Sequence, residues 1–389
     1  VDAMLAARKP VFYVGGGVIL ASACEHLRDL VRTLGAPVAS TLMGLGAFPG
    51  TDPLSLGMLG MHGTYEANMA MDGADLVIAL GARFDDRVTN NPDKFSPKAT
   101  IIHMDIDAAS INKIIDADIA LLGDGAWVLE QLSTRLTQAL KSRQKSALKD
   151  REEGLKSWWQ QLEYWRAANG LNHNLQAQAD KPILPQLAIQ SLYKVTGGDA
   201  FVCSDVGQHQ MFAAQYYHFD EPRRWINSGG LGTMGFGLPS AMGVQMGNPG
   251  ATVTCVTGEG SFMMNMQELS TCLQYGLPIK IINLNNQALG MVKQWQDMQY
   301  GGRHSQSTYS DSLPDFKTLI EAFGHVGIKV VDATKLDAAM EEAFSEANRN
   351  RLVFVDVWVD PHEHVYPMAI KGGAMRDMVL SKTTAAESS

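Results

Sequence analysis

TVTCVTGEGSFMMNMQELSTCLQYGLPIKIINLNN, residues 252–286, is the stretch that determines the predicted fold. A short apolar run ends in Gly-Glu-Gly-Ser, a helix-like stretch follows, and a second apolar run ends in Asn285 and Asn286. Short apolar runs joined by helical crossovers are typical of buried parallel strands. Ligands bind beyond the carboxyl ends of such strands, so Glu259 and Asn286 are expected at the same rim of a sheet.

These two strand ends carry oxygen atoms that suit a cation. Glu259 offers a carboxylate and Asn286 an amide oxygen, and Mg²⁺ is commonly held by one or two protein side chains plus phosphate oxygens. The Gly-Glu-Gly-Ser turn also opens a helix, whose free N–H groups suit a diphosphate. Taken singly, each feature is better explained by an ordinary turn. Together, in this order, they predict a diphosphate and Mg²⁺ site.

The same alternation extends through both halves of the chain. Apolar runs occur at 10–14, 37–41, 75–80, 100–106 and 119–123, and again at 199–205, 252–258, 279–285 and 352–360. Between the two series lie a long helical stretch from Trp127 and a polar segment, 170–182. The pattern predicts an α/β fold with two doubly wound parallel-sheet domains joined by a helical connector. The expected ranges are 1–140, 141–181 for the connector and linker, and 182–389.

Composition excludes several classes of protein. With 389 residues, 46% of them apolar, the chain is long enough for two domains with separate cores. The net charge of -9 and the absence of Lys or Arg runs disfavour nucleic-acid binding. No stretch reaches the ~20 apolar residues of a membrane span, and no signal peptide opens the chain. Four scattered cysteines without a CxxC pair favour a reducing, cytoplasmic setting.

Several longer segments resemble the catalytic subunit of acetohydroxyacid synthase, also called acetolactate synthase, a thiamin-diphosphate enzyme. They are GMHGTYEAN (60–68), GARFDDRV (81–88), SDVGQHQM (204–211), NSGGLGTMGFGLPSAMG (227–243), MNMQELSTCLQYGLP (264–278) and LNNQALGMVKQWQD (284–297). The resemblance implies a central FAD-binding domain followed by a diphosphate-binding domain. It also implies condensation of pyruvate with a second pyruvate or 2-ketobutyrate, in a homodimer or larger oligomer with a small regulatory subunit.

The resemblance assigns roles in the second half of the chain. Mg²⁺ would be held by Glu259, Asn286 and the carbonyl of Ala288. The carbonyl of Gly232 would accept a hydrogen bond from the aminopyrimidine, and Met234 would wedge beneath the cofactor, a place that suits an apolar, unbranched thioether. The family usually has Asp where this chain has Glu259, so its metal affinity is the least secure assignment. The remaining cofactor contacts would come from Gly207, Gln208, His209, Gly260, Ser261, Gly290 and Met291.

In the first half the resemblance implies an FAD site. The residues alone are less specific, because Leu20 stands where a dinucleotide G-x-G-x-x-G motif has its third glycine, and Asp105 fits a helix cap as well as a ribose contact. Arg87 would bind the carboxylate of the second substrate, for which its planar fork is suited. The implied FAD contacts are Gly15, Gly16, Gly17, Met61, His62, Gly63, Arg83, Asp85, Val88, Asp105, Ile106 and Asp124.

Trp295 would select the second substrate by size in this family, but it also fits the core face of a helix.

Other functions of the chain are also possible. Another thiamin-diphosphate enzyme, of the pyruvate oxidase or glyoxylate carboligase type, is a second possibility, and a nicotinamide dehydrogenase is disfavoured by the broken glycine motif. In the family, a glutamate on a preceding domain activates the cofactor. Nothing before Val1 supplies it, so a non-catalytic cofactor-binding fragment is a further possibility, and these residues alone are expected to be inactive.

Overall fold

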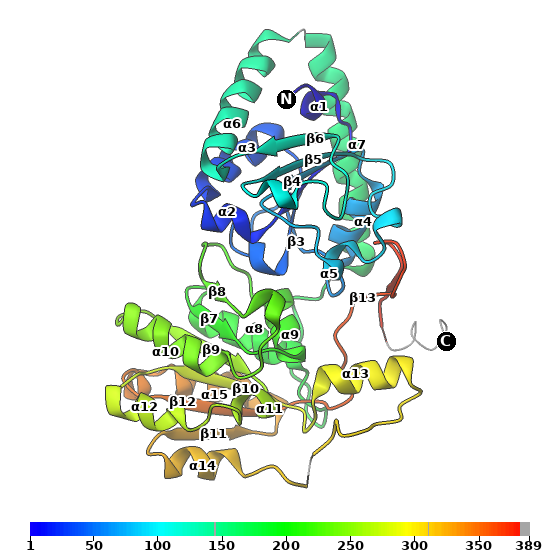
Figure 1. Cartoon of the computed structure of the whole chain (residues 1–389). Helices are drawn as coiled ribbons and strands as arrows, with labels where there is room; N and C mark the ends of the chain where they lie inside the picture. The colour runs from blue at the N-terminus through cyan, green and yellow to red at the C-terminus, as the bar shows by residue number, and fades with distance from the viewer. Residues whose placement is uncertain (144, 310, 382–389) are drawn as a thin grey trace. The chain divides into compact units, whose positions relative to one another are not determined.

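The computed structural model describes residues 1–143, 145–309 and 311–381, with only the backbone of residues 145–148 (Figure 1). The chain divides into two compact units. The first contains residues 1–171, 219–222 and 366–389, and the second contains residues 172–218 and 223–365. Each unit is built around a six-stranded parallel sheet, so the predicted α/β fold with two parallel-sheet domains is confirmed.

The sheet of the first unit has the strand order β3-β2-β1-β4-β5-β6. Strands β1, β2, β4 and most of β5 are buried where the apolar runs predict them, whereas β6 at one edge is largely exposed. Strand β3 is an additional edge strand that the sequence pattern did not reveal. The order reverses between β1 and β4, the kind of place where open α/β sheets bind ligands. The strand bounds are β1 Pro10–Val14, β2 Val38–Ser40, β3 Ser55–Met58, β4 Leu76–Leu80, β5 Thr100–Asp105 and β6 Ile119–Leu122.

Helices cover both faces of this sheet (Figure 1). One apolar cluster joins α3 and α6 to the sheet, and a second joins α4 and α7 to the opposite face. This two-sided cover explains why the strands are continuous apolar runs. The helix bounds are α1 Asp2–Ala6, α2 Gly16–Leu20, α3 Cys24–Leu34, α4 Tyr65–Gly73, α5 Asp86–Thr89, α6 Gly125–Ser142 and α7 Lys145–Asn169.

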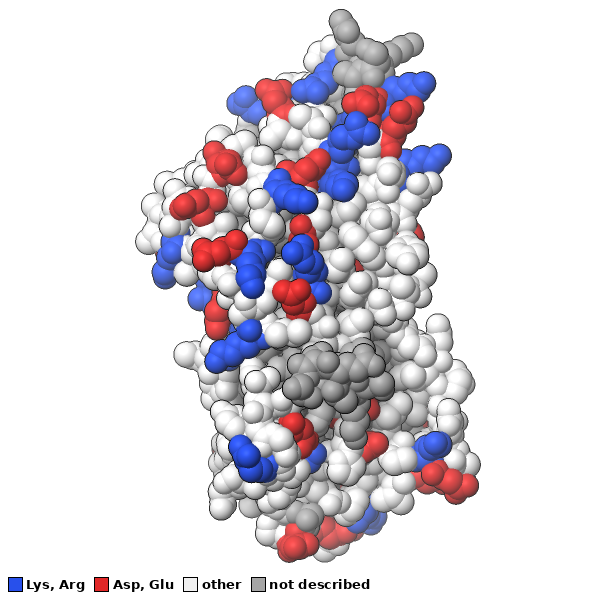
Figure 2. Space-filling model, turned by 90° about the vertical axis from the view of Figure 1, so that its right-hand side faces the viewer, with Lys and Arg blue, Asp and Glu red and all other residues white. Residues whose placement is uncertain are grey.

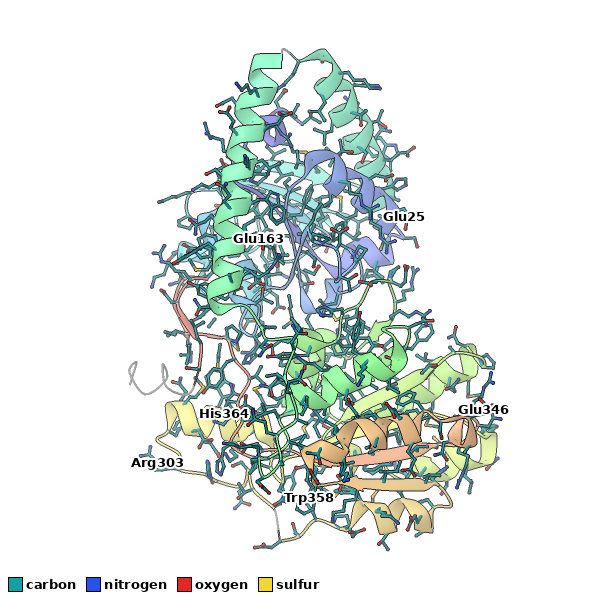
Figure 3. The ribbon with its side chains drawn as sticks, turned by 180° about the vertical axis from the view of Figure 1, so that it is seen from behind. Glu25, Glu163, Arg303, Glu346, Trp358 and His364 are labelled. Atoms are coloured by element: carbon teal, nitrogen blue, oxygen red, sulfur yellow. The ribbon has the colours of Figure 1, made fainter. Side chains whose placement is uncertain are left out.

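The helical stretch expected to be a connector packs on the first unit. Trp158 on α7 is fully buried, and its Nε1 donates to the carbonyl of Pro10 at 3.1 Å. Its ring meets that of Trp165 edge-on, at 5.7 Å between centroids, and Figure 3 shows Glu163 on the same helix. Aromatic packing thus holds this helix on the sheet, and α6 and α7 are layers of the first unit.

The end of the described chain also belongs to the first unit, although the sequence pattern places all of 182–389 in one domain. Strands β13 (Met368–Ala369) and β14 (Met378–Val379) pair antiparallel. The N–H of Ala369 donates to the carbonyl of Met61 at 2.8 Å. Main-chain pairing of this kind has no apolar periodicity, so it could not be predicted from the sequence pattern.

The sheet of the second unit has the order β11-β12-β10-β9-β7-β8. Its apolar core joins α10, α12 and α14 to one face of the sheet, and α8, α9 and α15 pack among themselves and on its strands. The bounds are β7 Phe201–Ser204, β8 Trp225–Ile226, β9 Val253–Thr257, β10 Lys280–Asn285, β11 Val326–Val330, β12 Val353–Trp358, α8 Pro185–Thr196, α9 Gln208–Tyr216, α10 Gly237–Gly247, α11 Glu259–Phe262, α12 Glu268–Tyr275, α13 Gly290–Gln299, α14 Phe316–Ala322 and α15 Leu336–Ala343.

Charged side chains of both signs are interspersed on the face shown in Figure 2, without a large area of one sign. Within the described ranges, no helix is both long and apolar enough to cross a membrane.

Candidate functional site

The predicted cation ligands meet at one rim of the second sheet. Strands β9 and β10 are parallel neighbours, so the turn after β9 and the end of β10 lie side by side. Glu259 Oε1 and Asn286 Oδ1 both accept the N–H of Ala288, at 2.9 and 3.1 Å. The structure therefore brings the two oxygen atoms together at the residue whose carbonyl completes the predicted set.

Burial shapes the charge of this cluster. Glu259 is 1% exposed, and burial raises the pKa of its carboxyl to about 8, with the nearby carboxylate of Asp356 adding to the increase. A bound cation favours the ionised form and lowers such a pKa. No three His, Cys, Asp or Glu side chains in the described part of the chain are grouped as a metal site. A cation here would depend on one carboxylate, an amide and a carbonyl.

The turn after β7 brings a histidine to the same rim. Strand β7 is the other neighbour of β9, and Gly207 precedes α9, which begins with Gln208 and His209. A Cβ on Gly207 or on Gly258 would lie within 2.9 Å of the His209 ring, so glycine leaves the space that the ring occupies. Burial lowers the pKa of His209 to about 3, and its Nε2 has no hydrogen-bond partner among the described residues. A ligand at this rim could supply that partner.

Met234 and Gly260 are also close together. A Cβ on Gly260 would lie 3.6 Å from the Met234 methyl and 2.7 Å from the Tyr309 hydroxyl. Ser261 donates to the carbonyl of Val206 at 3.3 Å, and Gly232 adopts a left-handed conformation with φ of 60°. The predicted pyrimidine-side and diphosphate-side residues thus lie at one end of the second sheet.

Helix α13 starts directly beyond this rim and carries Met291 and Trp295. A Cβ on Gly290 would lie 2.2 Å from Gln208 Oε1 and 2.3 Å from Asn286 Nδ2, so the first residue of the helix must be small. Trp295 is only partly buried, which disfavours the alternative that it is a fully packed core residue.

Sequence reasoning missed Asp205 as a residue that organises the rim. Its buried carboxylate accepts the N–H of Gly237 at 2.8 Å and the hydroxyl of Thr257 at 2.7 Å. It thereby joins the end of β7 to Gly237, the first residue of α10, and to Thr257, the last residue of β9. An acidic residue inside an apolar strand end, FVCSD, was the available signal.

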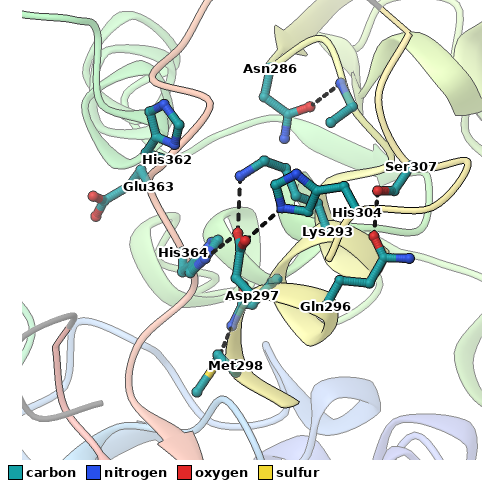
Figure 4. A network of polar contacts seen from close by, with 12 residues as sticks. Asn286, Lys293, Gln296, Asp297, Met298, His304, Ser307, His362, Glu363 and His364 are labelled. Atoms are coloured by element: carbon teal, nitrogen blue, oxygen red, sulfur yellow. Dashed lines mark hydrogen bonds and ion pairs between the residues drawn. The ribbon is translucent and has the colours of Figure 1, made fainter. Parts of the chain in front are cut away.

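Sequence reasoning also missed a polar network at the far end of α13 (Figure 4). Asp297 accepts from Lys293 at 3.0 Å, and lies 2.6 Å from His304 and 3.0 Å from His364. Figure 3 shows His364 beside this helix. The network connects α13 to the two chain segments that contain these histidines.

The predicted FAD residues lie at the carboxyl ends of strands in the first unit. Gly15 follows β1, Arg83 follows β4, Asp105 ends β5 and Asp124 follows β6, and these four strands are consecutive neighbours. The strand order places all four residues at one rim. Met61, His62 and Gly63 follow β3 at the far edge of the same sheet.

Several of these residues have structural contacts of their own. A Cβ on Gly15 would lie 2.2 Å from the Gly81 carbonyl, so the glycine turn allows β1 and β4 to approach closely. Asp85 caps α5 by accepting the N–H of Arg87 at 3.1 Å and also pairs with Arg83 at 2.7 Å. Asp124 caps α6 by accepting the N–H groups of Ala126 and Trp127.

The other predicted residues in this half differ in exposure and in their contacts. His62 is buried, with Nδ1 3.3 Å from the Pro367 carbonyl. Val88 is buried and Ile106 is 73% exposed. Arg87 Nη1 lies 3.8 Å from the Met61 sulfur. These positions leave Ile106 available to a ligand, whereas His62 is occupied at least in part by a backbone contact.

Comparisons with known proteins agree with the two-unit architecture. Residues 1–132 match the central domain of thiamine pyrophosphate enzymes, and residues 205–357 match their C-terminal TPP binding domain, thiamine pyrophosphate being thiamin diphosphate. The chain is 57% identical over 380 residues to the acetolactate synthase isozyme 3 large subunit of Escherichia coli and 53% identical over 381 residues to the acetolactate synthase large subunit of Haemophilus influenzae.

Each of these alignments covers 98% of this chain and 64% of the relative, so the chain spans less than two thirds of the length of these proteins. Acetolactate synthase 1 of Zea mays is 43% identical over 380 residues, which is 57% of its length. The chain therefore belongs to the thiamine pyrophosphate enzymes, of which it contains the central domain and the C-terminal TPP binding domain.

Proposed function

We propose that these residues are part of an acetohydroxyacid synthase, which decarboxylates pyruvate and joins the two-carbon unit to a second 2-ketoacid. The products would be 2-acetolactate, or 2-aceto-2-hydroxybutyrate when the acceptor is 2-ketobutyrate. The observation that carries the proposal is the convergence of Glu259 and Asn286 on the N–H of Ala288, at the rim of a TPP binding domain. The similarity to acetolactate synthases along 98% of the chain supports the choice of reaction.

The residues at the rim fit a divalent cation with a diphosphate. Hard oxygen atoms converge there, and the buried Nε2 of His209 lacks a partner in the described structure. In the proposal, Glu259, Asn286 and the carbonyl of Ala288 hold Mg²⁺. The diphosphate would lie against Gly207, Gln208, His209, Gly260 and Ser261, and Gly290 and Met291 would make further contacts with the cofactor.

Residues on the pyrimidine side would orient the cofactor. The Gly232 carbonyl would accept from its amino group, and Met234 would pack beneath it. A Cβ on Gly260 would lie 3.6 Å from the Met234 methyl, so the two residues are close in space. When bound, thiamin diphosphate supplies an electron sink for the carbanion that decarboxylation leaves. The contribution of the chain is to hold that cofactor in one conformation and to exclude water from it.

Arg87 and Trp295 would act on the second substrate. The guanidinium of Arg87 binds its carboxylate with a two-pronged hydrogen bond, and the Trp295 ring contacts its alkyl group. FAD would bind the first unit at the rim formed by Gly15–Gly17, Arg83, Asp105 and Asp124, with Met61, His62, Gly63, Asp85, Val88 and Ile106 as further contacts. Its role there is structural, because the condensation has no net electron transfer.

The proposal extends to partners and setting. The whole protein would work in the cytoplasm as a homodimer or larger oligomer, with the active site shared between subunits and a small regulatory subunit bound. The two bacterial relatives are large subunits of acetolactate synthases, which supports the presence of a second kind of subunit.

The test is product analysis on the complete protein that contains these residues. It would be supplied with thiamin diphosphate, Mg²⁺, FAD and pyruvate, with and without 2-ketobutyrate. Acetolactate as the main product supports the proposal. Acetaldehyde or acetyl phosphate without acetolactate would instead assign the chain to another thiamin-diphosphate reaction.

A further inference from the structure

A line of buried amide side chains runs from Asn286 to the backbone of Val365, within the second unit. Asn286 Nδ2 donates to Gln208 Oε1 at 3.0 Å, and Gln208 Nε2 donates to Gln294 Oε1 at 2.9 Å. Gln294 then forms two bonds with one residue: its Nε2 donates to the Val365 carbonyl at 3.1 Å, and its Oε1 accepts the Val365 N–H at 2.9 Å. Gln208 and Gln294 are both buried.

Backbone groups fix the direction of this line at both ends, at Val365 and at the N–H of Ala288, and the Glu363 carbonyl also accepts from Gln208 Nε2 at 3.4 Å. A side-chain amide can turn over and exchange its oxygen and nitrogen, but a backbone N–H and carbonyl cannot. The two bonds to Val365 therefore allow only one orientation of Gln294. With the Gln294 oxygen facing Gln208, the nitrogen of Gln208 must face Gln294, and its oxygen must face Asn286.

The consequence reaches the proposed cation site. Because Gln208 presents its oxygen, Asn286 must present its nitrogen to Gln208 and its Oδ1 to the opposite side, where Oδ1 meets the N–H of Ala288 at 3.1 Å. Only the oxygen of an amide can ligate Mg²⁺. We propose that Gln294 is a positioning residue that acts through Gln208 to hold the Asn286 amide with its oxygen toward the cation. This inference rests on the proposed role of Asn286 as a ligand.

Gln296 on the same helix provides a matched control. Its Nε2 donates to the Ser305 carbonyl at 3.0 Å, and its Oε1 accepts the Ser305 N–H at 3.3 Å. It thus holds a neighbouring backbone segment as Gln294 does, but it has no bond to Gln208. Substitution of either residue by Met removes the amide at similar volume.

The experiment measures Mn²⁺ binding by electron paramagnetic resonance, with thiamin diphosphate present, to the chain and its Gln294→Met, Gln296→Met and Asn286→Ala variants. Gln294→Met should weaken Mn²⁺ binding by about 10-fold, the usual loss when a partner of a metal ligand is removed. Gln296→Met should change it by less than about 2-fold, because the hydrogen bonds of Gln296 go to Ser305 and Ser307 and not to Gln208 or Asn286. Unchanged Mn²⁺ affinity in Gln294→Met would overturn the inference.

A double variant separates positioning from general loosening of the fold. In an Asn286→Ala background, Gln294→Met should cause no further loss, since the residue through which it acts is gone. An equal loss in both backgrounds would overturn the inference. If Asn286→Ala alone does not weaken Mn²⁺ binding, the proposed cation site itself is wrong.

A second variant covers the case in which Gln294→Met does not fold. A buried glutamate is favoured in its protonated form, so Gln294→Glu keeps an acceptor for Gln208 and a donor for the Val365 carbonyl. Its Mn²⁺ affinity should stay within about 3-fold of the parent, below the usual loss at such positions. A 10-fold loss in this variant, with an unchanged far-ultraviolet circular dichroism spectrum, would contradict the proposed role.

Discussion

At the scale of individual residues, Glu259 stands where the family resemblance implies an aspartate. The longer side chain of Glu259 still reaches the N–H of Ala288 at 2.9 Å, beside the amide oxygen of Asn286. The carboxyl is buried and its pKa is raised to about 8. A cation would compensate for the cost of ionising it, so the substitution is compatible with a cation site.

At the same scale, Trp295→Leu tests the proposed selection of the second substrate. The partly exposed ring can contact the extra methyl group of 2-ketobutyrate, and one methylene in an apolar pocket is worth ~1–3 kcal/mol. In the complete enzyme, the variant should lower the preference for 2-ketobutyrate over pyruvate by about 10-fold or more, while acetolactate synthesis from pyruvate continues. Competition assays with both acceptors measure the ratio.

Trp127→Leu is the control, because Trp127 is an exposed tryptophan on α6 in the other unit. Its product ratio should equal that of the parent. If Trp295→Leu also leaves the ratio unchanged, the residue does not contact the second substrate.

The sequence pattern placed the two proposed ligands at one rim, but it did not reveal the residues that hold them. Glu259 and Asn286 could be placed together because two successive parallel strands end at the same rim, a rule that needs only local pattern. Asp205 and Gln294 act through hydrogen bonds to residues 32 or more positions away. No periodicity or motif encodes such bonds, so only the structure could reveal them.

Among the elements, α13 carries Gly290, Met291, Gln294 and Trp295 of the proposed site, and Asp297 anchors its far end. Burial alone would raise the pKa of Asp297, but hydrogen bonds from His304 and Lys293 hold it below its ordinary value. A lowered carboxylate pKa means that ionised Asp297 contributes stability above its unfolded-state value of 3.8, and that the contribution is lost as the pH falls through the lower folded-state value.

Asp297→Asn should therefore lower the free energy of unfolding by about 1–3 kcal/mol at pH 7, the scale of hydrogen bonds to a charged group. The loss should not shrink between pH 7 and pH 5, since both lie above the unfolded-state pKa of 3.8. Urea unfolding at the two pH values provides the comparison, with Asp315→Asn as a control at an exposed cap of α14. A loss that disappears by pH 5 would show that the ionised carboxylate is not responsible.

Most elements of the fold were predictable and a few short ones were not. The buried central strands are continuous apolar runs because helices cover both faces of each sheet. Strand β3 was missed because Gly57, with φ of +80°, interrupts it, and β8 has only two residues. Edge strand β11 mixes Gly and Lys with its apolar residues, so it lacks the run that marks a central strand.

On the scale of the whole molecule, the first unit should bind FAD in preference to NAD. The rim residues are compatible with either nucleotide, but Leu20 occupies the place of the third glycine of a dinucleotide motif. Titration of the chain with FAD should quench flavin fluorescence, and an excess of NAD should not displace it. Displacement of FAD by NAD would revive the dehydrogenase alternative.

The matched domains also predict what these 389 residues can do by themselves. They are central and C-terminal domains, whereas the glutamate that activates the cofactor is expected on another domain of the family. Transfer of a proton by a positioned acid or base contributes ~10²–10⁴-fold, so a polypeptide of residues 1–389 should form acetolactate at no more than about 1% of the rate of a complete synthase. A colorimetric acetolactate assay on both proteins tests this, and comparable turnover would mean that residues 1–389 contain their own activating carboxylate.

The most direct test of the central claim is calorimetric titration of the 389-residue chain with thiamin diphosphate. The claim is that Glu259 and Asn286 hold a divalent cation that in turn holds the diphosphate. Binding should be saturable with Mg²⁺, should be lost when EDTA replaces Mg²⁺, and should weaken at least about 10-fold in Glu259→Gln and in Asn286→Ala. Equal affinity without Mg²⁺, or affinity unaffected by both substitutions, would contradict the account.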